Sequence, residues 1–249
     1  MHLTTRIPQS ARAATRTELV AVITGLMLCG GLAIPAAPST RVRSVRVQCA
    51  NNLKWLGAAS IGYADTNAGR FPTLTGASWP WDMPTATANR LVENGANRQL
   101  FYCPSVPAGN NDRLWRFSSG ADDNLASPEV GFRIVGYQFA FAGSGRVKTT
   151  NLTTSLKPAP WVINGLTNNP PLSERVIVAD AILSQGDNEL NRDQNTYGQI
   201  QGAVGQLQSA HLNGTLPGGG NLCFADGHVT WRPFLEMHVR TSGGPAFWW

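Results

Sequence analysis

The sequence of 249 residues is poor in charged side chains, which make up 14% of the chain, and it contains only four cysteines. It has no Gly-x-Ser-x-Gly elbow, no P-loop and no dinucleotide-binding fingerprint, so these marks of an enzyme are missing. The cysteines do not show the Cys-x-x-Cys spacing of a metal site, and no internal repeat is visible. We therefore expect a protein that is not an enzyme.

Glycine and proline are frequent, with 26 and 16 residues. This composition favours a domain rich in loops and turns over a helical bundle. The length is enough for one sizeable core with an appendage, so a single globular domain is the simplest expectation.

The net charge of +5 is concentrated near the N-terminus. Residues 1–54 contain seven Lys and Arg against one acidic residue, whereas residues 55–249 are nearly neutral. A nucleic-acid-binding protein should have its basic patch on the folded domain. We therefore expect no nucleic-acid partner, and interpret the basic residues as flanking an apolar segment where they would face lipid headgroups.

That apolar segment, Leu19–Thr40, has no formal charge over 22 residues. A helix needs roughly 20 apolar residues to cross a bilayer, so we expect a transmembrane helix over residues 14–40. A cleaved secretory signal ending near Ala36 and Ala37 is the alternative, but it gives no purpose to Glu18 at the entrance of the segment. The predicted helix contains several weakening residues, namely Gly25, Gly30, Gly31 and Pro35.

The stretch Glu18–Ile23, with Pro35 seventeen residues after Glu18, resembles the N-terminus of type IV prepilins and type II secretion pseudopilins. The resemblance implies a leader-like segment over residues 1–13, with cleavage after Ala13 and a methylated new N-terminus at Ala14. It implies that Glu18 acts in assembly by pairing with the N-terminal ammonium of a neighbouring subunit.

Residues 41–68 show apolar residues at helical spacing and end before Gly69 and Phe71-Pro72, which predicts a helix. The stretches Cys49–Gly57 and Phe101–Ser105 are similar to the large pilin-like proteins of the planctomycete type. This resemblance implies an α+β fold in which a long N-terminal transmembrane helix continues into a helix packed on a small antiparallel β-sheet, in a loop-rich domain spanning 41–249.

The strand signals lie mainly in residues 175–249, the predicted C-terminal β region. Arg175–Ala179 is a candidate buried strand, and Asp226-Gly227 predicts a tight turn between two short strands. Val130–Ala142 alternates moderately, while residues 143–174 lack periodicity and are expected to form a long loop.

His211 followed by Asp226-Gly227 is similar to a C-terminal His…Asp-Gly motif of the same family. The structural interpretation is that Asp226 and Gly227 form the turn and that His211 hydrogen-bonds a nearby loop. The alternative is a zinc site that also uses His228. A metal hydrolase would further need a general base and a cleft, which nothing in the sequence marks.

A polar loop contains four oxygen-bearing side chains that could bind calcium, which prefers six to eight oxygen ligands. It lacks the glycine and the terminal Glu of an EF-hand, and a solvated loop is the alternative. These side chains are Asp187, Glu189, Asn191 and Asp193. Apart from this calcium, we expect no cofactor.

Of the four cysteines, Cys29 lies in the apolar segment and is interpreted as a small apolar side chain. The other three would lie in an oxidising compartment. A Cys49–Cys103 disulfide, tying the predicted helix to the domain, is the preferred pairing, although Cys223 leaves other pairings open.

The resemblance implies a pilin-like subunit held in the inner membrane by a single helix, with its domain in the periplasm or in an extracellular filament. Its partners would be other pilin-like subunits, a prepilin peptidase and a secretion or pilus assembly platform. The alternative is a secreted or anchored envelope protein that binds a glycan or another partner without polymerising.

Overall fold

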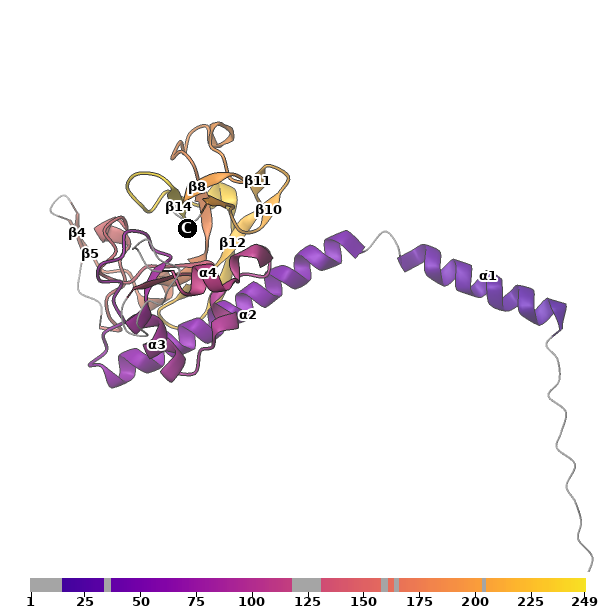
Figure 1. The fold of residues 1–249 in the computed structure, drawn as a ribbon, viewed down its shortest axis with the longest axis horizontal. Coiled ribbons are helices and arrows are strands. Elements are labelled where there is room, and N and C mark those ends of the chain that lie inside the picture. The colour runs from indigo at the N-terminus through magenta and orange to yellow at the C-terminus, as the bar shows by residue number, and fades with distance from the viewer. Residues whose placement is uncertain (1–14, 34–36, 118–130, 158–160, 164–165, 203–204) are drawn as a thin grey trace, which may run out of the picture. The chain divides into compact units, whose positions relative to one another are not determined.

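The computed structural model describes residues 15–33, 37–117, 131–157, 161–163, 166–202 and 205–249. Contacts divide the chain into two units, residues 1–43 and residues 44–249. The second unit contains every strand of the described chain and is drawn from violet to yellow in Figure 1.

The first helix begins with a reciprocal pair of hydrogen bonds between Thr15 and Glu18. The Thr15 backbone N–H donates to Glu18 Oε2 at 2.8 Å, and the Glu18 backbone N–H donates to Thr15 Oγ1 at 3.4 Å. This is a capping box, which satisfies helix N–H groups that have no partner in the first turn. The described α-helices are α1 Arg16–Ala33, α2 Ala37–Thr66, α3 Thr85–Glu93 and α4 Asp112–Trp115.

The predicted transmembrane helix over residues 14–40 is wrong. None of the helices in the described residues is long and apolar enough to cross a membrane. Helix α1 ends at Ala33 after 18 residues, and its first turn contains Arg16 and Glu18. Helix α2 begins separately at Ala37 and is not apolar on average. The count of uncharged residues did not take into account that α1 ends at Ala33 and that its first turn is charged.

The strands are short and all their pairings are antiparallel. They are β1 Asp82–Pro84, β2 Phe132–Ile134, β3 Tyr137–Phe139, β4 Trp161–Ile163, β5 Leu166–Asn168, β6 Val176–Asp180, β7 Ile182–Ser184, β8 Ile200–Gly202, β9 Gly205–Leu207, β10 Leu212–Asn213, β11 Leu216–Pro217, β12 Gly219–Phe224, β13 Val229–Pro233 and β14 Ala246–Trp248. Short 3-10 helices connect them: η2 Arg98–Phe101, η3 Pro107–Gly109, η4 Thr149–Asn151, η5 Leu172–Glu174, η6 Arg192–Gln194 and η7 Phe234–Glu236.

The predicted fold class therefore needs correction beyond the membrane helix. The sequence predicted one long helix on one small sheet, whereas the described chain mixes four α-helices with several antiparallel sheets. The largest of these sheets has four strands in the order β13-β12-β6-β3, and the others are two-stranded. The five two-stranded sheets of the described chain are built from strands of two or three residues.

The centre of the four-stranded sheet is formed by β6 and β12, whose residues are all buried. Both strands are rich in apolar residues, as expected for strands covered on both faces. The β12–β13 hairpin turns at Asp226-Gly227, where Gly227 has φ +89°. A positive φ is readily adopted by glycine and strained for a residue with a Cβ.

Helix α2 lies against β12, as Figure 1 shows. Gly57 of α2 approaches Cys223 of β12 so closely that a Cβ at this position would overlap the cysteine Sγ. Nearer the start of the helix, the Arg46 guanidinium lies 3.7 Å from the ring centre of Trp231 in β13. The Arg46 carbonyl accepts a hydrogen bond from Asn221 Nδ2 at 3.2 Å. Helix α2 is therefore held against the sheet at Arg46 and at Gly57.

Candidate functional site

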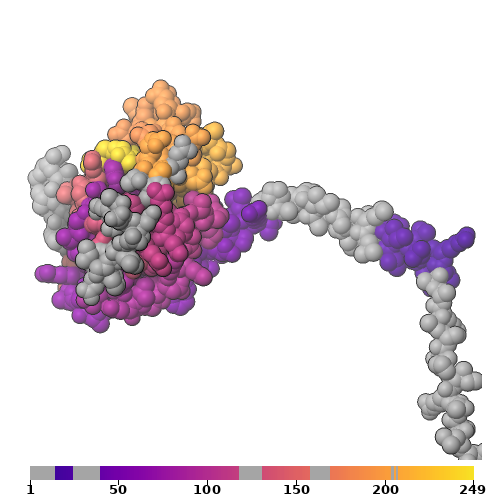
Figure 2. All heavy atoms as spheres, viewed as in Figure 1, coloured from indigo at the N-terminus to yellow at the C-terminus, as the bar shows by residue number. Residues whose placement is uncertain are grey.

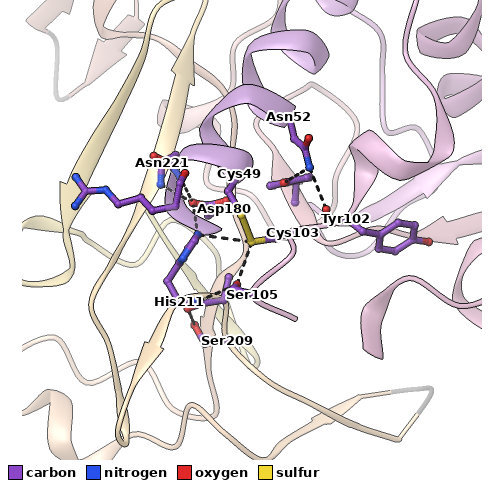
Figure 3. The surroundings of a disulfide bond; sticks show 12 residues. Cys49, Asn52, Tyr102, Cys103, Ser105, Asp180, Ser209, His211 and Asn221 are labelled. Carbon is purple, nitrogen blue, oxygen red and sulfur yellow. Dashed lines mark hydrogen bonds and ion pairs between the residues drawn. A yellow bond between two sulfur atoms is a disulfide. The ribbon is translucent and has the colours of Figure 1, made fainter. Parts of the chain in front are cut away.

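A disulfide joins helix α2 to the segment that follows η2, and it forms the centre of a buried polar cluster (Figure 3). Cys49 is fully buried and Cys103 is 2% exposed. Their Cα atoms are 5.5 Å apart across a sequence separation of 54 residues. In a chain-entropy treatment, closing a loop of this length stabilises the folded state by about 4 kcal/mol. This is the pairing that the sequence analysis preferred.

His211 lies beside the disulfide and is placed there by its backbone. Its φ of +52° is in the left-handed region, and its carbonyl accepts a hydrogen bond from the Gly218 N–H at 2.9 Å, which closes the small β10–β11 hairpin. The His211 N–H donates to Ser105 Oγ at 3.1 Å. The imidazole Nε2 is 3.6 Å from Cys103 Sγ, while Ser105 Oγ is 3.0 Å from the same sulfur.

Asp180, the last residue of β6, supplies the carboxylate of the cluster. Its Oδ2 lies 2.9 Å from His211 Nε2 and accepts hydrogen bonds from the Asn221 backbone N–H at 2.6 Å and from Asn221 Nδ2 at 2.9 Å. The Asp180 side chain is fully buried, and its Oδ1 has no hydrogen-bond partner among the residues described. A buried carboxylate oxygen without a partner is costly, so this atom calls for an explanation.

The charge of Asp180 also affects the neighbouring Tyr137. Burial raises the pKa of Tyr137 well above its ordinary value, and the nearby Asp180 carboxylate raises it further. The Tyr137 hydroxyl accepts a hydrogen bond from Asn52 Nδ2 at 3.1 Å, which lowers the pKa but does not outweigh burial. The interior around Asp180 is therefore poorly hydrated, and ionic interactions there are stronger than at the surface.

Four potential metal ligands meet in this cluster. One ligand atom each from Cys49, Cys103, Asp180 and His211 lies within 4.8 Å of the other three. With the disulfide formed, the two sulfurs are bonded to each other, and the histidine and the aspartate form a hydrogen-bonded pair. With the disulfide reduced, the same atoms would offer two thiolates, an imidazole and a carboxylate, which is a donor set that suits zinc.

A cavity of about 650 Å³ adjoins the cluster. Its lining includes Tyr102, Ala181 and Ala210, each the immediate chain neighbour of a cluster residue. Trp81 and Leu114 contribute apolar surface to the same cavity. The cavity has the size of a small-molecule site, and it brings an open space close to the buried sulfurs.

The structure gives His211 and Asp226 different partners, although the sequence placed them in one motif. Asp226 Oδ1 lies 2.6 Å from His228 Nδ1 at the exposed β12–β13 turn, and it also accepts the His228 N–H at 3.1 Å. The turn interpretation of Asp226 and Gly227 agrees with this geometry. The alternative zinc site of His211, Asp226 and His228 is not assembled, because His211 is bonded to Asp180 instead.

The three carboxylates of the predicted calcium loop, Asp187, Glu189 and Asp193, do not form a ligand cluster in the described part of the chain. The Glu189 carboxylate is 2.7 Å from His238 Nδ1 and accepts the Val239 N–H at 2.9 Å. Asn191 precedes η6, and its N–H donates to Asn188 Oδ1 at 2.8 Å. The loop of residues 187–193 belongs to the orange upper part of the second unit in Figure 2. Calcium binding by Asp187, Glu189, Asn191 and Asp193 stays a prediction.

At the N-terminus, Ala13 and Ala14 lie outside the described residues, so the predicted processing stays a prediction. Glu18 is exposed and caps α1. The backbone hydrogen bond from Thr15, and then its side-chain hydrogen bond, lower the pKa of Glu18. Glu18 therefore has a local role in a single chain as the partner of Thr15 in the capping box.

Sequence reasoning missed Asp180, Ser105 and Asn221 as members of the cluster. A signal for Asp180 was present, because an acidic residue ends the apolar run Val176–Ala179 and is followed by the apolar Ala181–Leu183. A carboxylate within a buried apolar run needs a partner.

Comparison with protein-family models, curated proteins and solved structures finds no match for this chain.

Proposed function

We propose that this chain is a pilin-like structural subunit of the cell envelope, which assembles with further subunits through its N-terminal helical segment. Its domain, residues 44–249, would be displayed outside the cytoplasm. The partners would be other pilin-like subunits and the platform that assembles them, with a peptidase acting on the N-terminal leader. The proposal assigns the chain a structural role and no catalytic one.

The observation that carries the proposal is the exposed apolar surface of α1. Four of its side chains are between 43% and 60% exposed, namely Leu19, Val20, Val22 and Ile23. Adjacent exposed apolar side chains mark surfaces that are covered by another molecule. A second copy of the same helix has a matching surface, and helices with such surfaces associate side by side.

Two further features support a structural subunit. The start of α2 in the second unit is fixed by a disulfide, a cation–π contact and a hydrogen bond within the span Arg46–Cys49. In a domain fixed in this way, a shift of α2 would also shift the surface of the domain. The disulfide also suits an oxidising compartment, where such bonds persist.

The test is filament recovery from cells that express the full chain together with an assembly platform of the type IV pilus class. In one variant Val20→Asp places a charge on the exposed face of α1. In the matched control Leu190→Asp changes a fully exposed leucine in the second unit. We expect Val20→Asp to lower the sheared-filament fraction at least several-fold and the control to leave it unchanged. Equal recovery from both variants would refute assembly through α1.

The cavity near Tyr102 favours a second candidate, an envelope protein that binds a small ligand. Trp81 and Tyr102 line it, and aromatic side chains are common in sites for sugars and other partly apolar ligands. Val106→Trp would fill part of this cavity. If the variant lost binding of an envelope glycan while filament recovery stayed normal, the cavity would have a function of its own.

A further inference from the structure

We propose that Cys49, Cys103, His211 and Asp180 form a zinc site when the disulfide is reduced, so that the same four residues stabilise the domain in two alternative ways. In the oxidised protein a covalent bond joins α2 to the segment after η2. In the reduced protein a metal ion would join α2, this segment, the end of β6 and the residue before β10. The inference is independent of the proposed assembly function.

The donor set of the reduced cluster is one that zinc binds. Two thiolates, one imidazole and one carboxylate are all ligands that zinc accepts, and four protein ligands are the usual number in a structural site. All four side chains are buried, with the His211 side chain the most exposed at 6%. Because no position would be left open for water, the site would stabilise the fold and would not activate a nucleophile.

The carboxylate of Asp180 has one oxygen without a partner among the described residues. Asn221 and His211 fully engage Oδ2, but Oδ1 has no hydrogen-bond partner among the described residues and is inaccessible to solvent. A cation bound by Oδ2, the oxygen that lies 2.9 Å from His211 Nε2, would partly neutralise the charge on Oδ1 as well. It would also replace the His211–Asp180 contact by two metal bonds, which need the unprotonated Nε2 of the imidazole.

The distances between the ligand atoms also fit a tetrahedral zinc site. Zn–S bonds of about 2.3 Å and Zn–N or Zn–O bonds of about 2.0–2.2 Å put tetrahedral ligand atoms about 3.3–3.8 Å apart. The Nε2–Oδ2 separation of 2.9 Å and the Nε2–Sγ separation of 3.6 Å for Cys103 are close to these values. The two sulfurs must move apart when their bond breaks, and the other pairs of ligand atoms need to approach by no more than about 1.5 Å, since none is more than 4.8 Å apart and tetrahedral ligands lie about 3.3 Å or more apart.

Groups around the cluster would orient the ligands. Asn221 donates two hydrogen bonds to the Asp180 carboxylate, and Ser105 contacts both the Cys103 sulfur and the His211 backbone. Partners of this kind fix ligand rotamers, and their loss typically weakens metal binding by about 10–100-fold. The cavity lined by Tyr102, Ala181 and Ala210 lies next to the cluster along the chain, because each of these residues is the immediate neighbour of a ligand.

A phosphine can serve as the reductant that converts the disulfide into the zinc site. The phosphine transfers two electrons to the disulfide and takes up one oxygen from water, giving the phosphine oxide and two thiols. Zinc binding then releases the two thiol protons to solvent, because only thiolates are ligands. The product has two thiolates, one carboxylate and one divalent cation, which leaves one negative charge in the cluster.

The test uses the full chain, reduced with a water-soluble phosphine under anaerobic conditions. After gel filtration, we expect one zinc per chain in the reduced protein and none in the oxidised protein. Cobalt substituted for zinc should give the thiolate charge-transfer band and the visible bands of a tetrahedral site. His211→Ala and Asp180→Asn should each weaken zinc binding at least about tenfold. The matched controls are His238→Ala and Cys223→Ala, a histidine and a cysteine outside the cluster, and these should bind as the wild type does.

Zinc should also raise the melting temperature of the reduced chain, because an ion that binds only the folded state stabilises it. The proposal is overturned if the reduced chain takes up no zinc, or if binding is unaffected in both His211→Ala and Asp180→Asn. It is equally overturned if reduction unfolds the chain and zinc does not restore the fold.

Discussion

The contact between Gly57 of α2 and Cys223 of β12 allows a quantitative test of how the helix meets the sheet. A Cβ built on Gly57 would overlap Cys223 Sγ, whereas its next neighbours, Cys223 Cβ and Ile177 Cδ1, lie at an ordinary contact distance of 3.8 Å. Only the sulfur atom therefore obstructs an alanine. Overpacking of this kind costs about 1–3 kcal/mol, while replacing Gly by Ala inside a helix gains about 1 kcal/mol. We expect Gly57→Ala to destabilise the second unit by up to about 2 kcal/mol.

Cys223→Ala removes the obstructing sulfur and leaves a small space, which should also destabilise by about 1 kcal/mol. In the double variant the new methyl group occupies the space of the lost sulfur, so the two costs should cancel in large part. We expect a coupling energy of about 1–2 kcal/mol in favour of the double variant. All eight tryptophans lie beyond residue 54, so their fluorescence in denaturant reports the second unit. Strictly additive effects in this double-mutant cycle would show that α2 does not contact β12 as described.

Four further outcomes are expected. Gly227→Val should cost about 1 kcal/mol or more in thermal or denaturant unfolding, since Gly227 has φ +89°; an unchanged midpoint would contradict the turn. Burial raises the pKa of Asp82 from 3.8 to about 6, partly offset by its hydrogen bonds to the backbone, so the folded state holds this proton more tightly than the unfolded state. Stability should therefore fall by roughly 3 kcal/mol as pH rises from about 4 to above 6; Asp82→Asn should flatten this slope, and an identical slope in the variant would refute the assignment. Calcium should raise the melting temperature of the wild type but not of Asp187→Ala, and equal melts with calcium and with a chelator would mean that the loop is merely solvated. Glu18→Gln preserves the capping box and removes the charge, so filament recovery should fall as much as in Glu18→Ala if assembly depends on charge; recovery equal to the wild type would limit Glu18 to capping.

Sequence patterns located those elements whose signals are local. The predicted helix 41–68 corresponds to α2, which ends at Thr66, and the chain turns at Ala68 and Gly69, both with positive φ. The Gly69 N–H donates to the Ala64 carbonyl at 2.8 Å, a bond typical of a glycine after a helix end. The β12–β13 hairpin was likewise marked by its Asp-Gly turn. In both places a few adjacent residues determine the backbone.

Other elements have no local pattern in the sequence that would predict them. Residues 143–174 were expected to form a long loop, yet β4 and β5 pair there with three residues each, too few to show an alternating pattern. The cluster around the disulfide combines residues from five separate segments, and no spacing in the sequence relates Cys103 to His211. The predicted membrane helix failed for a different reason, because a count of uncharged residues ignores where a helix begins and ends.

The position of the disulfide has a mechanical consequence. If the second unit is pulled between residue 44 and its C-terminal strand β14, tension enters the chain only a few residues before Cys49 and then crosses the sulfur–sulfur bond to Cys103. The 54-residue span between the two cysteines would then bear no load, although it includes most of α2 and all of α3. At about 3.5 Å per extended residue, roughly 190 Å of chain would stay unextended in the oxidised protein. Reduction would release this length, so the redox state of one bond sets how far the unit can stretch.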